Sequence, residues 1–384
     1  MEATTTRAQN KAAVLSAALA AGQCTRSSIE TRTGLSKATV ARIVDELLGE
    51  GLLQPGAELH REGRGRKSLY LELGTQVGCV VGVDLGLTTT RLWCADLRGT
   101  ELARSRFDTP KGLTRLAMVR RLVAEVQALI DGTAYSGRLS GVVVAVVGSV
   151  RNEVEIVRAA APFSYLEGSQ FCAALERHFA VPVILDSDAN MALCGEMVDG
   201  VAVDTRDAAL LIVSTSVRAG LARDGRVLRS DRSLIGELAW LPVPSRGSQR
   251  RCLDDVLSAR GVLAAAHHSD TAADIAELAA ADDRSELATA RGEFVDGLVV
   301  AVSTVALTVD PDIVVVTGRM LPVVERVLGE VNEQLKSVLP AVPRLVLASS
   351  NGFAAAHGAA LTAVDGARTR LMYSIVRQPI TDVV

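Results

Sequence analysis

The sequence of 384 residues predicts a small α+β domain at the N-terminus, followed by a larger, two-lobed α/β domain. Residues 10–73 carry helical patterns and then one hairpin pattern. From Cys79 onward, Val-rich strand patterns alternate with helical ones, as they do around a buried sheet. In this second part, two hairpins of small and hydroxyl residues recur about 130 residues apart, which indicates two related halves. We therefore expect domains at 1–74 and 75–384.

Composition limits the classes of protein to which the chain can belong. Hydrophobic residues make up 48% of it and aromatic residues only 3%, which favours an α/β protein over one that stacks on bases. We find no uninterrupted apolar run of the ~18 to 20 residues that cross a bilayer, and no signal-peptide core. The six cysteines form no CxxC pair. These observations predict a cytoplasmic protein with reduced thiols and no membrane contact.

Charge is unevenly distributed along the chain. The net charge is −3, but residues 1–70 carry ten Lys and Arg against seven Asp and Glu, which leaves +3 there and −6 in the rest. A basic end on an acidic protein is a candidate nucleic-acid surface, although an ordinary solvated surface can carry the same excess.

The first 50 residues predict three short helices. The first spans residues 10–21 and begins at Asn10, the second spans 26–33 after the cap Thr25, and the third spans about 37–49. In the third, apolar residues recur at helical spacing, so one face packs inward. This order is a helix-turn-helix, whose second helix enters the major groove of DNA. The residues predicted to face DNA from this helix and its start are Ser36, Lys37, Thr39 and Arg42.

A hairpin pattern follows the three helices. Residues 51–73 alternate apolar and polar at both ends of a Pro-, Gly- and Arg-rich centre. Three cations occupy the centre, where they can reach phosphates or a minor groove: Arg64, Arg66 and Lys67. We therefore predict a winged helix that binds an inverted-repeat duplex as a homodimer or homotetramer. The alternative is a small helical bundle with a solvated basic loop.

The second part alternates strands with helices. The predicted strands are 79–86, 89–96, 141–150, 181–186, 208–214 and 312–318. The predicted helices are roughly 111–132, 167–179, 252–267, 286–309, 320–338 and 353–365. A first hairpin carries Asp84, Gly86 and Thr88, the residue types of a phosphate and Mg²⁺ site, although such a turn also occurs by chance. The second, with its turn at 214–220, reads STSVRAG.

These motifs, taken in order, resemble the ROK family, a group of bacterial repressors and sugar kinases with an actin-like ATPase and sugar-kinase fold. The motifs are GLSKATVARIVDELLGEGLL, GRGRK, GVDLGLTTTRLWCADLRG, LDSDAN, GELAW, RCLDD, DPDIVVVTGR and HGAALTA. The resemblance covers nearly all of the chain. It implies a two-lobed sugar-kinase-like domain behind the winged helix.

Relative to the family, the second hairpin has lost its glycines. Where ROK kinases have a GTGIGAG-like loop, this chain has Ser214, Ser216 and Arg218. A β-carbon at each position blocks the close approach of the backbone to a triphosphate, and the side chain of Arg218 fills the space. Two alternatives stay open for this arginine, binding of some other anion and a surface salt bridge. We therefore predict a lost phosphate site, no ATP cofactor and no enzymatic activity.

The sugar-binding motifs are altered as well. The resemblance implies that Asp188 stands where kinases have their catalytic base, while Ser187 replaces a sugar-binding Asn and Trp240, after Glu237, replaces a His that contacts sugar and zinc. Asp254 follows the single remaining cysteine of the zinc motif, Cys252. The predicted effector-binding residues are Ser187, Asp188, Glu237, Trp240 and Asp254. Residues 186–188 also suit a helix cap.

We predict no metal site. Two of the motif's three cysteines are replaced, by Ser245 and Gly247, and neither residue can supply the thiolate that structural zinc requires. The adjacent His267 and His268 would point in different directions on a helix.

Three functions are compatible with these patterns. The first is a transcription factor, favoured as a repressor, whose large domain senses a small metabolite such as a sugar or sugar derivative. The second is a sugar kinase, against which the damaged phosphate loop counts. The third is a DNA-binding dimer with a ligand-independent scaffold domain. We favour the sensor, because the retained acids can line a polar cleft between the two halves.

Overall fold

The N-terminal part of the chain consists of three helices and a hairpin. The computed structural model describes residues 2–21, 24–59, 68–244, 250–265, 271–281, 287–348 and 352–377. The N-terminal elements are α1 (Glu2–Ala21), α2 (Arg26–Thr33), α3 (Lys37–Gly49), β1 (Leu53–Leu59) and β2 (Ser68–Leu73). The two strands pair antiparallel. The elements therefore occur in the predicted order.

Local caps set the ends of α2 and α3. The hydroxyl of Thr25 accepts the N–H of Ser28, the hydroxyl of Ser28 accepts the N–H of Thr25, and Gly34 ends α2 with φ of +68°. The hydroxyl of Ser36 accepts the N–H of Thr39 at the start of α3. The predicted bounds of both helices are confirmed.

The predicted start of the first helix is wrong. Helix α1 begins at Glu2 rather than at Asn10, and Asn10 lies inside it. Arg7 and Lys11 both form ion pairs with Glu46 of α3, at 3.2 and 3.0 Å. These contacts with α3 favour the helical conformation of a polar segment that has no apolar periodicity of its own.

The first lobe contains a five-stranded sheet in the order β5-β4-β3-β6-β9. Strands β5, β4 and β3 are antiparallel, whereas β3, β6 and β9 are parallel. The elements are η1 (Thr75–Val77), β3 (Cys79–Leu85), β4 (Thr89–Asp96), β5 (Glu101–Asp108), α4 (Arg115–Asp131), β6 (Leu139–Val146), β7 (Gly148–Arg151), β8 (Glu155–Ala159), η2 (Ala161–Leu166), α5 (Gln170–Phe179) and β9 (Val183–Ser187). Side chains of α4 and α5 share one apolar core with this sheet.

The second lobe repeats this arrangement. Its sheet has the order β12-β11-β10-β15-β16, again with an antiparallel hairpin followed by parallel strands. The elements are α6 (Asp188–Asp199), β10 (Ala208–Val213), β11 (Val217–Arg223), β12 (Arg226–Val227), η3 (Leu238–Trp240), β13 (Pro242–Val243), β14 (Arg251–Cys252), α7 (Leu253–Leu257), α8 (Ala259–Ala265), α9 (Ala272–Ala280), α10 (Ala288–Val309), β15 (Ile313–Thr317), α11 (Leu321–Val338) and β16 (Arg344–Leu347). The last helix, α12 (Ala354–Arg377), follows β16 in the chain but packs on the sheet of the first lobe, where its Ala359 shares a core with Val80 and Val143. The equivalent order in both lobes confirms the expectation of two related halves.

Each predicted strand of the large domain coincides with a strand, but several elements differ from expectation. The single strand predicted at 141–150 is two strands in different sheets, β6 and β7. The edge strand β5 was not predicted, because all of its residues are half-buried or exposed and it has no buried apolar run. The predicted helix 252–267 is two helices, α7 and α8, interrupted at Ser258, and α12 continues to Arg377 rather than ending near 365. The predicted turn at 214–220 is shorter, because β11 already begins at Val217 and pairs with β10.

Helix α10 is unusually long and apolar. Among the described residues it is the one helix long and apolar enough to cross a membrane, and half of its most apolar stretch is buried inside the protein. Phe294, Leu298 and Val302 of α10 lie in the core of the second lobe. The burial of this face agrees with a core helix of a folded domain.

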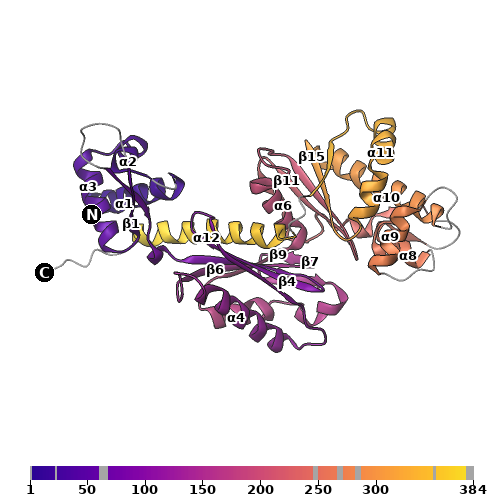
Figure 1. Ribbon diagram of the computed structural model, residues 1–384, viewed down its shortest axis with the longest axis horizontal. Coiled ribbons are helices and arrows are strands. Elements are labelled where there is room, and N and C mark those ends of the chain that lie inside the picture. Colours follow the sequence, from indigo (N-terminus) through magenta and orange to yellow (C-terminus); the bar gives the residue numbers. More distant parts are fainter. Residues whose placement is uncertain are drawn as a thin grey trace.

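Helices α6 and α12 connect the three parts of the molecule. In Figure 1, α12 runs from the region between the lobes to the N-terminal domain. A Cβ added to Gly358 of α12 would lie only 1.9 Å from the carbonyl oxygen of Met191 on α6, so the two helices touch backbone to backbone. At the other end of α12, Ile375 shares a core with Leu15 of α1. Helix α6, which starts at the predicted effector site, thus contacts α12, and α12 reaches the N-terminal domain.

Candidate effector site between the lobes

The site is built where β9 passes directly into α6. Ser187 is the N-cap of α6, and its hydroxyl accepts the N–H of Asn190 at 3.2 Å, so the cap predicted for this segment is present. The carboxylate of Asp186 accepts hydrogen bonds from the side-chain amide of Asn190 at 2.8 Å and from Nε of Arg229 at 2.7 Å. The segment therefore presents an ordered set of hydroxyl, carboxylate and guanidinium groups at the start of a helix.

A buried ion pair lies behind this segment. Arg218 of β11 donates from Nε to Oδ1 of Asp188 at 2.9 Å and from a terminal nitrogen to Oδ2 at 2.6 Å. The two side chains are only 9% and 10% exposed. Burial disfavours the guanidinium charge, but Asp188, Glu237 and Asp254 outweigh it and raise the pKa of Arg218. Arg218 therefore lies in a strand rather than in the predicted turn, and its ion pair is buried rather than at the surface.

Two cavities meet at Arg218. The smaller, of about 290 Å³, is lined by residues that include Ser149, Asp186, Ser187, Asn190, Arg229, Asp231 and Glu237. The larger, of about 620 Å³, is lined by residues that include Gly148, Arg158, Thr215, Ser216, Trp240, Asp254 and Arg260. Both are lined by Ser149, Arg218 and Glu237. We call them the small and large compartments. Arg218 and Glu237 lie where one compartment ends and the other begins.

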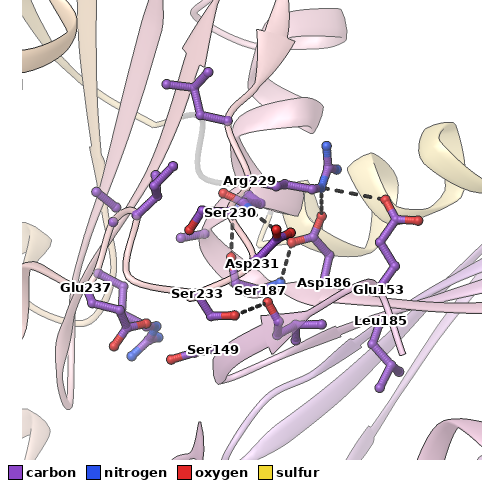
Figure 2. A pocket seen from close by; sticks show the side chains of 18 of the residues that line it. Ser149, Glu153, Leu185, Asp186, Ser187, Arg229, Ser230, Asp231, Ser233 and Glu237 are labelled. Carbon is purple, nitrogen blue, oxygen red and sulfur yellow. Dashed lines mark hydrogen bonds and ion pairs between the residues drawn. The ribbon is translucent and has the colours of Figure 1, made fainter. Parts of the chain in front are cut away.

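The small compartment is polar and has acids on two sides. Figure 2 shows Arg229 reaching both Asp186 and Glu153, while Glu237 lies on the other side of the cavity. Ser233 closes part of the wall by donating its hydroxyl to the carbonyl oxygen of Val150 at 2.7 Å. Both arginines that line the compartment are paired with carboxylates, so hydroxyl and carboxylate groups remain for a ligand.

The predicted effector residues are divided between these compartments. Ser187 lines the small one, Glu237 lines both, and Trp240 and Asp254 line the large one. Asp188 lines neither, because Arg218 engages both of its oxygens. Asp254 also accepts the N–H of Val217 at 2.9 Å, which anchors the start of β11.

Trp240 is more exposed than an apolar wall of a closed cleft would be. Trp240 is 62% exposed, and the guanidinium of Arg158 lies 4.5 Å from the centroid of its ring. Arg158, Arg229 and Ser149 were not predicted from the sequence. No motif marks these residues, since they reach the site only through the pairing of β7 with β8 and through the loop after β12.

The first hairpin is also occupied by an ion pair. Asp84, predicted from its motif as a phosphate or Mg²⁺ residue, lies 3.4 Å from Arg91 of β4. The pKa of Asp84 is raised to about 7. Burial is the largest cause, Arg91 opposes it and Asp188 adds to it. Within the described ranges, no group of three or more His, Cys, Asp or Glu could hold a metal ion. Ser245, Gly247, His267 and His268 lie outside those ranges.

The predicted DNA-facing residues are only partly described. Ser36, Lys37 and Arg42 are exposed, whereas Thr39 is half-buried and its hydroxyl lies 2.9 Å from that of Ser36. The hairpin cations Arg64, Arg66 and Lys67 lie outside the described residues. The structure therefore brings Lys37 and Arg42 to the surface of α3.

Solved structures first define the class of fold. The chain is similar to the crystal structure of a ROK family transcriptional regulator, homolog of the E. coli MLC protein, with a TM-score of 0.74 and 18% identity over 97% of this chain and 99% of that one. It is also similar to a ROK family glucokinase from Streptomyces griseus solved with glucose and AMPPNP, with a TM-score of 0.61 and 20% identity over 75% of this chain and 100% of that one. The large domain thus has the two-lobed ROK fold.

The family follows from the sequence match. The ROK family model matches residues 80–365, and the chain belongs to the ROK family. A putative xylose repressor from Caldicellulosiruptor sp. (strain Rt8B.4) is 24% identical over 260 residues, 66% of this chain and 65% of that protein. The chain therefore spans slightly less than two thirds of the length of this curated relative.

Proposed function

We propose that the protein is a DNA-binding transcriptional repressor whose ROK domain binds a small sugar or sugar derivative. The observation that carries the proposal is the exposure of Lys37 and Arg42 on the second helix of a helix-turn-helix, ahead of a ROK domain. The similarity to a putative xylose repressor supports the same class of function. In this proposal residues 1–74 bind DNA, and residues 75–384 bind the effector and form the oligomer.

The partners follow from this geometry. A two-fold homodimer, or a homotetramer of two such dimers, places two α3 helices on one face of an inverted-repeat duplex. The effector enters the small compartment, where Ser187 and Glu237 are available to sugar hydroxyls. The protein works in the cytoplasm and needs neither a metal nor a nucleotide cofactor.

The buried ion pair supports binding over catalysis. A carboxylate that accepts two hydrogen bonds from a buried guanidinium is a poor general base, because taking a proton would break the pair. Arg218 also lies at the boundary between the compartments, on the path by which a phosphoryl group from one would reach a hydroxyl in the other. We therefore propose that the ROK domain has no sugar-kinase activity.

Two measurements test the function. Removing a base-reading arginine with Arg42→Ala should weaken operator binding by ~1 to 3 kcal/mol at fixed salt. In a thermal-shift screen of sugars and sugar derivatives, an effector that binds only the folded state must raise the melting temperature. Unchanged operator affinity in Arg42→Ala would contradict the assignment of α3 as the recognition helix. Saturable, ATP-dependent sugar phosphorylation that Asp188→Asn abolishes would restore the kinase alternative.

A further inference from the structure

The side of α3 that points away from the core carries two charges of opposite sign. The buried side consists of Val40, Ile43, Val44 and Leu47. The opposite side consists of residues at successive spacings of four, three and four: Ala38, Arg42, Asp45 and Gly49. Because Ala38 and Gly49 have no polar side chains, Arg42 and Asp45 alone offer hydrogen-bonding groups along this line.

Asp45 is held in place by a residue of the neighbouring helix. Arg26, the first residue of α2, donates to Oδ1 of Asp45 at 2.5 Å and to the carbonyl oxygen of Ala41 at 3.3 Å. The second carboxylate oxygen of Asp45 has no hydrogen-bond partner among the described residues, and 65% of the side chain is exposed. One oxygen is therefore fixed by the protein and the other is available to a partner.

If α3 enters a DNA groove, the negative charge of Asp45 is unfavourable unless it is paired or contacts a base. Phosphates repel a carboxylate, so an unpaired Asp45 would weaken binding, and the cation of Arg26 offsets that repulsion. In the major groove, an acidic side chain also has one good partner, the amino group of cytosine, whereas arginine pairs with guanine. Asp45 follows Arg42 by three residues, or about 4.5 Å along the helix, close to the ~3.4 Å step between base pairs.

We propose that Asp45, positioned by Arg26, reads a cytosine amino group at the base pair beside the guanine that Arg42 reads. This inference rests on the proposed DNA-binding function. Arg26 acts as a positioning residue, since it contacts Asp45 and Ala41 and is not itself assigned to a base. A purely structural role, in which the pair only ties α2 to α3, would alter stability and leave base preference unchanged.

The test is selection from duplexes that carry a randomised segment, using the full chain and its variants. Wild type should select a motif with adjacent guanine and cytosine in each half-site. Because Asn pairs with adenine rather than cytosine, Asp45→Asn should move the preference at one position from cytosine to adenine. The change in relative affinity should be roughly 5- to 150-fold, measured at fixed salt on duplexes that differ at that base pair.

Two further variants separate the explanations. Arg26→Ala should reduce discrimination at the same base pair and leave the guanine preference intact. Glu330→Gln removes one negative charge from an exposed position on α11 and should select the wild-type motif. An Asp45→Asn protein that binds DNA with the wild-type base profile would overturn the inference while leaving the proposed function standing. A wild-type protein that selects no motif would overturn both.

Discussion

Removal of Arg218 should reveal how strongly the molecule depends on its buried ion pair. In an Arg218→Met variant, the carboxylate of Asp188 keeps its burial and loses both guanidinium hydrogen bonds. Breaking a buried pair by deleting one partner destabilises proteins by ~3 to 5 kcal/mol, because an uncompensated charge remains. We expect a loss of that size in the free energy of unfolding, measured by urea unfolding at constant pH with a check that the slope is unchanged.

Two companion variants test the cause. Arg226 is exposed on β12, so Arg226→Met should change stability by no more than ~0.5 kcal/mol. The double variant Arg218→Met/Asp188→Leu replaces the pair with apolar side chains and should recover most of the lost stability, since such replacements are often neutral. If Arg218→Met were as stable as Arg226→Met, or if the double variant were less stable than Arg218→Met, the reasoning would be refuted.

Two further predictions concern the contact between α6 and α12 and the dependence of stability on pH. Gly358→Ala should destabilise by ~1 to 3 kcal/mol through its clash with the backbone of α6, whereas Gly329→Ala, on an open helix surface, should be neutral or stabilising in the same urea titration. Folding raises the pKa of Asp84 to about 7, so between pH ~4 and about 7 the folded state binds a proton that the unfolded state has released. The contribution of this proton to the free energy of unfolding is complete below pH ~4 and is lost as the pH rises through about 7. Urea midpoints of Asp84→Asn should therefore depend less on pH across that window, and a profile parallel to that of wild type would contradict the assignment.

The parts of the fold that follow local rules were predictable from sequence. Thr25, Gly34 and Ser36 set helix ends by bonds within three or four residues, so α2 and α3 were predicted with the correct bounds. The buried strands β3 and β10 are mostly apolar and are bounded by turns, so their positions were also predictable. The start of α1 was missed because it depends on ion pairs with α3, more than 30 residues away.

The candidate site was less predictable, because its groups meet only in the folded chain. The motif drew attention to Asp188, and the lost glycines drew attention to Arg218, but no local pattern states that these two residues are partners. Their contact depends on α6 packing against β11, 30 residues further along the chain. The same holds for Asp254, which looked like a ligand residue and also fastens the start of β11.

The return of α12 to the N-terminal domain has a consequence for the order of folding. Ile375 is synthesised about 360 residues after Leu15 of α1, yet it packs into the same core. During translation, domains near the N-terminus generally fold first, so α1 emerges long before its partner exists. A nascent chain therefore holds an incompletely packed N-terminal domain until α12 has been synthesised. Truncation within the last turns of α12 would leave that apolar surface open in the finished protein, with aggregation as the expected failure.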